Sequence, residues 1–216
     1  MKFWMGGVAA LLGCCIALAQ EPAQPLVPAR KSSTTIKRGD PYTPMTAEER
    51  LQVFLRRAVT SPGTPARAAF LAVFDQHAND PEGWGQGWDA YGRRFGNRMA
   101  RSAVRNGIES ASAAALGFDQ RYVLCNCDGV LRRTGHALAM NFVTYNRHGH
   151  WVPNVPRVGS TIAAEYIGLT WLPPGTRTTG EATRGLALNL LTGSLTNIWR
   201  EFSPPMMRQL KTRLKR

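Results

Sequence analysis

The sequence predicts a mainly α-helical fold, a compact helical bundle built around a glycine- and alanine-rich central helix. From residue 46 onward, apolar residues recur at helical spacing, and clusters of proline and glycine separate the periodic segments. Strand character is confined to residues 122–130, where Asp128-Gly129 suits the turn of one small β-hairpin. With 216 residues, the chain is long enough to bury a hydrophobic core in one domain.

The N-terminal segment has the pattern of a cleaved secretory signal over residues 1–19. An apolar stretch ends in Ala17-Leu18-Ala19, the small-x-small pattern at which a signal peptidase cuts, so the mature chain is expected to begin near Gln20. Two alternatives remain, a single membrane anchor and a lipoprotein acylated at Cys14. The predicted location is the periplasm or outer envelope of a bacterium, with membrane attachment as a further option.

Three further regions follow this segment. Residues 20–45 are rich in Pro, Ser, Thr and basic residues and poor in large apolar groups, which predicts a flexible linker. Residues 46–205 are expected to form the helical domain, and residues 206–216 a short basic tail.

The first two helices of the domain have recognisable start signals. Thr46 and Glu49 form a Thr-x-x-Glu capping box, and apolar residues follow it at helical spacing. Ser61-Pro62-Gly63 ends that helix, and Thr64 is expected to cap the next one. Residues 68–74 (AAFLAVF) have no polar side, so this second helix is expected in the core or against lipid.

The central helix is predicted to begin at Trp88 and to end near Leu116. Glycine and alanine gather on one of its faces, and each glycine lowers helix propensity by about 1 kcal/mol. Close approach of another backbone would explain Gly92, Gly96 and Gly107 on this face, whether in a bundle or in lipid. An ordinary amphipathic helix with small residues against a large neighbour is the alternative.

Basic residues form the best candidate binding surfaces. The chain has 27 Lys and Arg against 14 Asp and Glu, a formal net charge of +13, which favours anionic partners. Export makes an anionic lipid or an envelope polyanion the expected partner and excludes nucleic acid; no protein partner is indicated. Alternatively, the helix stripe is a solvated face or pairs internally with Asp89, Glu109 and Glu165. The candidate residues are the stripe Arg94, Arg98, Arg101 and Arg105 and the tail residues Arg208, Lys211, Arg213, Lys215 and Arg216.

Helical periodicity continues through the C-terminal half. Further helices are expected over residues 131–145, 158–171 and 183–201. Pro173-Pro174-Gly175 separates the last two, and Pro204-Pro205 is expected to end the last one.

Cysteine and histidine give two weaker candidates. Cys125 and Cys127 could form a disulfide in an oxidising compartment, either a redox site or a passive link. His148 and His150, with more distant histidines, match no zinc template, so neither a metal nor another cofactor is expected.

Glu165 is the only catalytic candidate, and a weak one. It lies in a mainly apolar helical segment, where a carboxyl group could act as a general acid on a glycan. An ion-paired structural carboxylate is the more common outcome. The sequence has no nucleophile elbow, zinc-protease motif or P-loop.

Four sequence blocks resemble a family of uncharacterised exported bacterial proteins. The blocks are WGxGxxxYGxRFG at Trp84–Gly96, DxRY at Asp119–Tyr122, RxGxAL at Arg133–Leu138 and EFxP at Glu201–Pro204. The resemblance covers roughly residues 46–205 in the same block order. It implies an envelope location and brings no known activity.

The expected function is therefore non-enzymatic: a structural or interaction protein of the bacterial envelope that associates with membrane lipid or polyanionic material. The alternative is a periplasmic hydrolase that acts on cell-wall glycan through Glu165.

Overall fold

The computed structural model describes the backbone of residues 34–214 and the side chains of residues 34–58 and 61–203. The predicted signal segment and most of the predicted linker lie outside this part of the chain. The main helices are α2 (Ala47–Leu55), α3 (Gly63–His77), α4 (Trp88–Leu116), α5 (Val130–Ala139), α6 (Val155–Gly168) and α7 (Thr179–Leu214). Short helical turns lie at Arg56–Thr60, Glu82–Trp84, Leu169–Trp171 and Pro174–Thr176.

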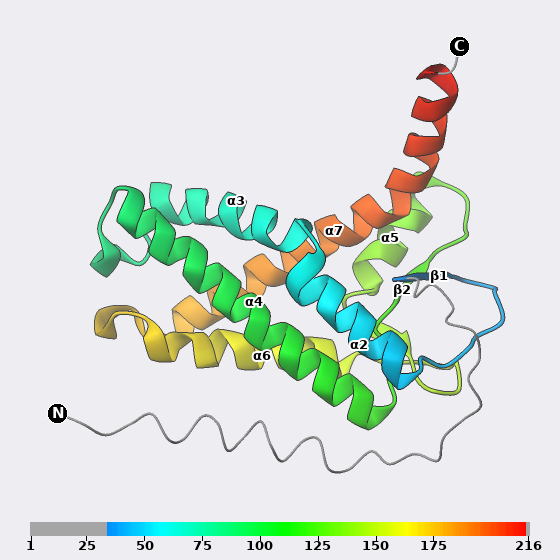
Figure 1. Ribbon diagram of the computed structural model, residues 1–216, viewed down its shortest axis with the longest axis horizontal. Coiled ribbons are helices and arrows are strands. Elements are labelled where there is room, and N and C mark those ends of the chain that lie inside the picture. The colour runs from blue at the N-terminus through cyan, green and yellow to red at the C-terminus, as the bar shows by residue number, and fades with distance from the viewer. Residues whose placement is uncertain (1–33, 215–216) are drawn as a thin grey trace. The chain divides into compact units, whose positions relative to one another are not determined.

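The mainly α-helical prediction is confirmed, and α4 is the central helix. It packs against α2, α3 and α6, while α7 packs against α5 and α6 (Figure 1). The capping box at the start of α2 is present: the hydroxyl of Thr46 accepts from the backbone N–H of Glu49 at 3.2 Å, and the Glu49 carboxylate accepts from the backbone N–H of Thr46 at 3.0 Å. Thr64 does not cap α3, because the helix begins one residue earlier.

Two short strand pairs accompany the helices. The strand predicted near residue 122 is present as β2 (Tyr122–Leu124), but its partner is the parallel strand β1 (Thr35–Lys37). The antiparallel pair forms further along, between β3 (Val143–Tyr145) and β4 (Trp151–Pro153). Part of the predicted linker therefore belongs to the fold, since β1 needs β2 for its backbone hydrogen bonds.

Two predicted helix ends are wrong. The helix expected over residues 131–145 ends at Ala139, because residues 143–145 pair as strand β3. The last helix passes through Pro204-Pro205 and continues to Leu214. Proline keeps a φ angle that a helix accepts. It removes its own N–H donor and its ring crowds the carbonyl of residue i−4, so it weakens or kinks a helix without always ending it.

The predicted close packing at the glycine face of α4 is also wrong. A Cβ atom built on Gly92, Gly96 or Gly107 would have no atom of the described residues within 4 Å beyond the backbone of its own helix. Gly92 and Gly96 are exposed. The small residues face outward because the opposite, polar side of α4 is the one that packs against its neighbours.

We expect Gly96→Ala to stabilise the protein by up to about 1 kcal/mol, because it gains helix propensity and meets no neighbour. Gly185→Ala in α7 should instead destabilise it by about 1–3 kcal/mol, because the added methyl group would collide with the carboxylate of Glu165. Urea unfolding of both variants tests this pair. Destabilisation by Gly96→Ala would show that this face of α4 is covered.

The interior of the fold is unusually polar. Seven of the fifteen buried apolar residues in the described part of the chain are alanines, and an apolar cluster centres on Tyr122, Val123 and Met140. Buried polar residues line the inner faces of four helices: Asp75, Arg94, Arg101, Ser102, Asn106, Glu109, Ser160, Thr161, Glu165, Asn197 and Glu201. Large apolar side chains such as Phe70, Leu195 and Trp199 are instead exposed.

This inverted distribution leaves apolar surface facing outward, and apolar exposure on such a scale marks an interaction surface. None of the helices in the described part of the chain combines the length and the apolar character that crossing a bilayer requires.

Candidate functional site: an arginine-lined cavity

The arginine stripe of α4 faces the interior of the fold. Arg94 is 0% exposed and Arg101 is 4% exposed, while Arg98 and Arg105 are partly buried. The expected surface stripe is therefore wrong. Helical periodicity identified the residues that share a face, but it did not identify which face the neighbouring helices cover.

Two of these arginines bind segments that precede α4 in the chain, namely α3 and the loop after it. The guanidinium of Arg94 donates to the carbonyl oxygens of Asp80 at 2.8 Å and Pro81 at 3.2 Å, which holds the loop after α3. The guanidinium of Arg98 donates two hydrogen bonds, at 2.7 and 2.6 Å, to the carboxylate of Asp75 in α3. Such bidentate pairs are among the stronger interactions available to a carboxylate.

The other two bind α6 and α7. Arg101 donates to the carboxylate of Glu165 in α6, and its Nη2 lies 3.8 Å from the carboxylate of Glu181 in α7. Arg105 donates to the Asn189 side-chain oxygen in α7 at 2.7 Å. The stripe therefore joins α4 to three neighbouring helices.

Internal pairing of the stripe was one of the expectations, and one of its three expected partners is correct. Glu165 pairs with Arg101, but Glu109 pairs with Arg57 at 3.1 Å. Asp89 pairs with Arg93 on the exposed side of α4.

A cavity of about 370 Å³ lies beside the C-terminal half of this stripe, between α3, α4, α6 and α7. Among the described residues, its lining contains one carboxylate, that of Glu109. The lining also contains five arginines, which come from separate parts of the chain: Arg57, Arg67, Arg105, Arg157 and Arg200. The cavity lining therefore carries a large excess of positive charge.

Several of these guanidinium groups have unused hydrogen-bonding capacity. The Nε of Arg105 is buried and has no hydrogen-bond partner within residues 34–58 and 61–203. Among the described residues, the guanidinium groups of Arg157 and Arg200 have no acceptor; Arg200 instead lies over the ring of Tyr122, at 5.7 Å from its centroid. Unpaired donors at a buried site are costly, so these groups favour an additional anionic acceptor.

The electrostatics of the cavity also favour an added anion. Burial lowers the pKa of Arg67 to about 9, and repulsion from Arg105 and Arg157 adds to the shift. Burial, with repulsion from Arg57 and Arg157, lowers the pKa of Arg200 to about 10. These shifts mean that the positive charges are unfavourable where they stand, and a bound anion would relieve them.

Glu109 compensates only part of this charge. Burial raises the pKa of its carboxyl group, but Arg57, Arg157 and Arg105 outweigh burial and hold the pKa below its ordinary value. Glu109 is therefore ionised at neutral pH. Neutral polar groups complete the lining and could contribute further hydrogen bonds: Asn106, Asn141, Thr161, Asn189, Thr192 and Thr196.

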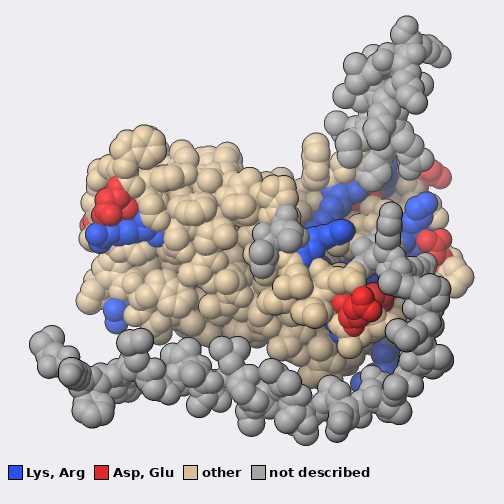
Figure 2. Space-filling model, viewed as in Figure 1, with Lys and Arg blue, Asp and Glu red and all other residues tan. Residues whose placement is uncertain are grey.

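On the face shown in Figure 2, most of the surface belongs to residues that are neither acidic nor basic. Lysine and arginine side chains gather near the region where α2 and α7 cross in Figure 1. Further basic side chains on this face lie at its left end, beside acidic ones, and at its right edge.

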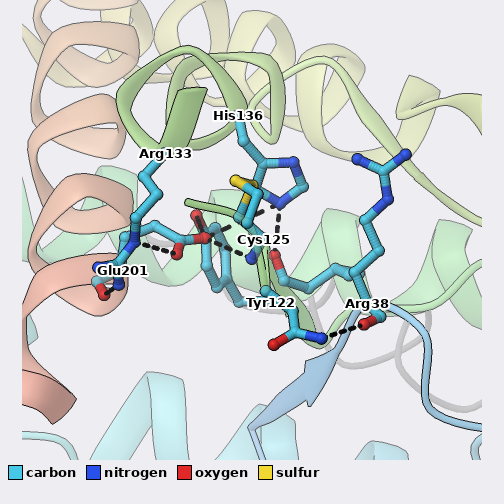
Figure 3. Close-up of a disulfide and its surroundings, with 9 residues drawn as sticks. Arg38, Tyr122, Cys125, Arg133, His136 and Glu201 are labelled. Carbon is cyan, nitrogen blue, oxygen red and sulfur yellow. Dashed lines mark hydrogen bonds and ion pairs between the residues drawn. A yellow bond between two sulfur atoms is a disulfide. The ribbon is translucent and has the colours of Figure 1, made fainter. Parts of the chain in front are cut away.

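A second polar cluster surrounds the disulfide, which forms between Cys125 and Cys127 (Figure 3). The buried carboxylate of Glu201 in α7 accepts hydrogen bonds from the hydroxyl of Tyr122 at 2.8 Å and from the backbone N–H of Cys125 at 3.0 Å. Arg133 lies 3.8 Å from the same carboxylate. Glu201 thus holds the disulfide loop against α7.

This cluster brings three of the four family-like blocks together. Tyr122 belongs to the second block, Arg133 to the third and Glu201 to the fourth. His136 donates from Nε2 to the carbonyl oxygen of Val123 at 2.7 Å, which also fixes this loop. These contacts explain the block residues by packing and hydrogen bonding.

The remaining candidates have little support as reactive sites. Glu165 is 1% exposed, and its carboxylate accepts hydrogen bonds from Arg101 and Asn189. In the described residues, no group of three or more His, Cys, Asp or Glu side chains is arranged to hold a metal ion. The side chains of the basic tail, from Arg208 to Arg216, lie outside the described residues.

Four of the five cavity arginines were missed by sequence reasoning: Arg57, Arg67, Arg157 and Arg200. Arg67 offered the clearest signal, because it interrupts an otherwise apolar helical segment. Comparison with protein-family models, curated proteins and solved structures gives no match for this chain. What the cavity binds must therefore be inferred from its own side chains.

Proposed function

We propose that this chain is a non-enzymatic binding protein that takes a phosphate-type oxyanion into the arginine-lined cavity. The supporting observation is the charge of that cavity, five arginines against one carboxylate in about 370 Å³. A volume of that size falls within the range of small-ligand pockets, roughly 300–1,000 Å³.

Phosphate chemistry fits these side chains better than a single carboxylate does. A guanidinium presents planar, paired donors that match phosphate oxygens, and it stays charged at neutral pH when partly buried. Several guanidinium groups around one site need an acceptor with several oxygens and more than one negative charge. Within the described part of the chain, the Nε of Arg105 and the guanidinium of Arg157 have no acceptor, so both can supply donors.

The proposed setting is the bacterial envelope, where such a protein would act as an interaction component. Export through the signal at residues 1–19 and the family resemblance both stay predictions, and the cavity is compatible with them. Cell-wall glycan hydrolysis through Glu165 has no support from the geometry, because its carboxylate already accepts hydrogen bonds from Arg101 and Asn189.

Calorimetric titration of the purified protein with inorganic phosphate tests the proposal. We expect saturable binding of about one phosphate per chain, weakened as ionic strength rises because salt screens the arginines. The matched control is Arg93→Gln, which removes an arginine from the exposed side of α4 and should leave the affinity unchanged. Absence of binding by the unaltered protein would contradict the proposal.

Anion affinity should fall as pH rises above about 9. The free cavity releases the proton of Arg67 in this range, whereas a bound anion favours the charged guanidinium, so proton loss opposes binding. Sulfate is the suitable probe, because its own charge is constant there. We expect constant affinity between about pH 6 and pH 8 and a progressive loss toward about pH 10. A flat profile would show that Arg67 does not act on the ligand.

A further inference from the structure

The mouth of the arginine-lined cavity is apolar. Phe70 of α3 and Leu195 of α7 both line the cavity, yet their side chains are 61% and 57% exposed. The same site therefore presents positive charge inside and hydrocarbon surface at its outer edge. A ligand that fills both parts must itself be anionic at one end and apolar at the other.

Helix α7 repeats this division along its length. Its inward residues recur every four positions as Gly185, Asn189, Gly193, Asn197 and Glu201, which are buried or half-buried. Its outward residues recur at the same interval as Ala187, Leu191, Leu195 and Trp199, all exposed. A helix on a water-facing surface shows the opposite order, with the polar stripe outward.

Helix α3 extends the apolar edge on the other side of the cavity. Phe70 and Phe74 contact each other edge to face, with ring centroids 4.8 Å apart, and Val73 is exposed beside them. Exposed large apolar side chains on α3 and α7 thus lie next to a cavity with excess positive charge. Contiguous apolar surface beside a charged pocket indicates an amphiphilic partner.

We infer that the ligand of this site is a phospholipid-type amphiphile, with its phosphate headgroup among the cavity arginines and its acyl chains along the apolar edge. This inference rests on the proposed function and makes it more specific. A soluble polyanion, such as polyphosphate or an acidic glycan, would satisfy the arginines but would leave Phe70 and Leu195 exposed. Only a ligand with hydrocarbon chains uses both parts of the site.

Calorimetry with three soluble probes separates the possibilities. The probes are glycerol phosphate, a headgroup alone; dihexanoyl phosphatidic acid below its micelle concentration, the same phosphomonoester with chains; and tripolyphosphate, a polyanion without chains. We expect the lipid to bind at least tenfold more tightly than glycerol phosphate, because removing roughly two CH₂ groups from water already accounts for a factor of ten. Tripolyphosphate should bind no more tightly than the lipid.

Variants of the apolar edge provide the second half of the test. Leu191→Gln combined with Trp199→Gln changes exposed positions outside the cavity lining, so inorganic phosphate affinity should stay the same while lipid affinity falls about tenfold. The matched control is Leu131→Gln on α5, an 88% exposed leucine away from the cavity, which should change neither affinity.

The outcomes distinguish this inference from the proposed function. Equal affinity for the lipid and for glycerol phosphate would overturn the lipid assignment and leave anion binding intact. Tighter binding of tripolyphosphate than of the lipid, or unchanged lipid affinity in the double variant, would also overturn the lipid assignment. Failure of every phosphate probe to bind would overturn both.

Discussion

Glu165→Gln should destabilise the protein by about 3 kcal/mol or more. The exchange keeps the shape of the side chain, but it leaves the buried guanidinium of Arg101 without its closest carboxylate. Removing one partner of a buried ion pair typically costs about 3–5 kcal/mol, because the other charge remains in a medium of low polarity. The Glu181 carboxylate, 3.8 Å from Arg101, should keep the loss near the lower end of that range. Urea unfolding at neutral pH measures the effect.

Asp89→Asn is the matched control for this exchange. It makes the same chemical change in an ion pair with Arg93, whose side chains are 57% and 80% exposed. Exposed pairs of this kind contribute at most about 0.5 kcal/mol, so the free energy of unfolding should hardly change. Similar losses from both variants would contradict the buried role assigned to Glu165.

Arg157→Gln should abolish anion binding and, without ligand, stabilise the protein. Arg157 is one of five like charges around the cavity, and it donates no hydrogen bond to a described side chain that its removal would break. Relief of repulsion should raise the free energy of unfolding by an amount on the order of 1 kcal/mol. A ligand at one hundred times its Kd stabilises the unaltered protein by about 2.7 kcal/mol, and the variant should lose that gain.

Thermal unfolding with and without phosphate measures both effects on the same samples. Arg93→Gln again serves as the control, and it should keep the ligand-induced stabilisation. If Arg157→Gln instead destabilises the free protein and keeps phosphate binding, the guanidinium of Arg157 is structural. Functional sites commonly lower the stability of the free protein in this way.

Much of the helical framework could be predicted from the sequence, because local signals determine it. The capping box at Thr46 and Glu49 and the Trp88–Leu116 segment gave correct helix positions. The parallel pairing of residues 35–37 with 122–124 could not be predicted in this way, because it joins segments far apart in the chain and neither segment contains a signal for the other.

The orientation of α4 was the more consequential error. Its glycine face was expected to pack and its arginine face to be accessible, whereas the structure places the arginines inward. Periodicity reports which residues share a face; the partners of that face decide whether it is buried. Arg98 turns inward because Asp75 lies opposite, and Arg101 does so because Glu165 lies opposite.

The cavity could not be predicted from the sequence, because its arginines come from segments between residues 57 and 200 and meet only in the folded chain. No local motif connects them. The weaker signal was compositional: a net charge of +13 in a chain with abundant apolar residues. It predicted an anionic partner, which stays a proposal, and it gave no indication of where that partner would bind.

The most direct test of the arginine-lined cavity is a crystal structure of the protein soaked with tungstate, a tetrahedral phosphate mimic that scatters strongly. The anomalous density should place one tungstate within hydrogen-bonding distance of guanidinium groups of Arg105 and Arg157, inside the cavity. Tungstate bound only at exposed basic side chains, with the cavity free of anomalous density, would contradict the proposed anion site.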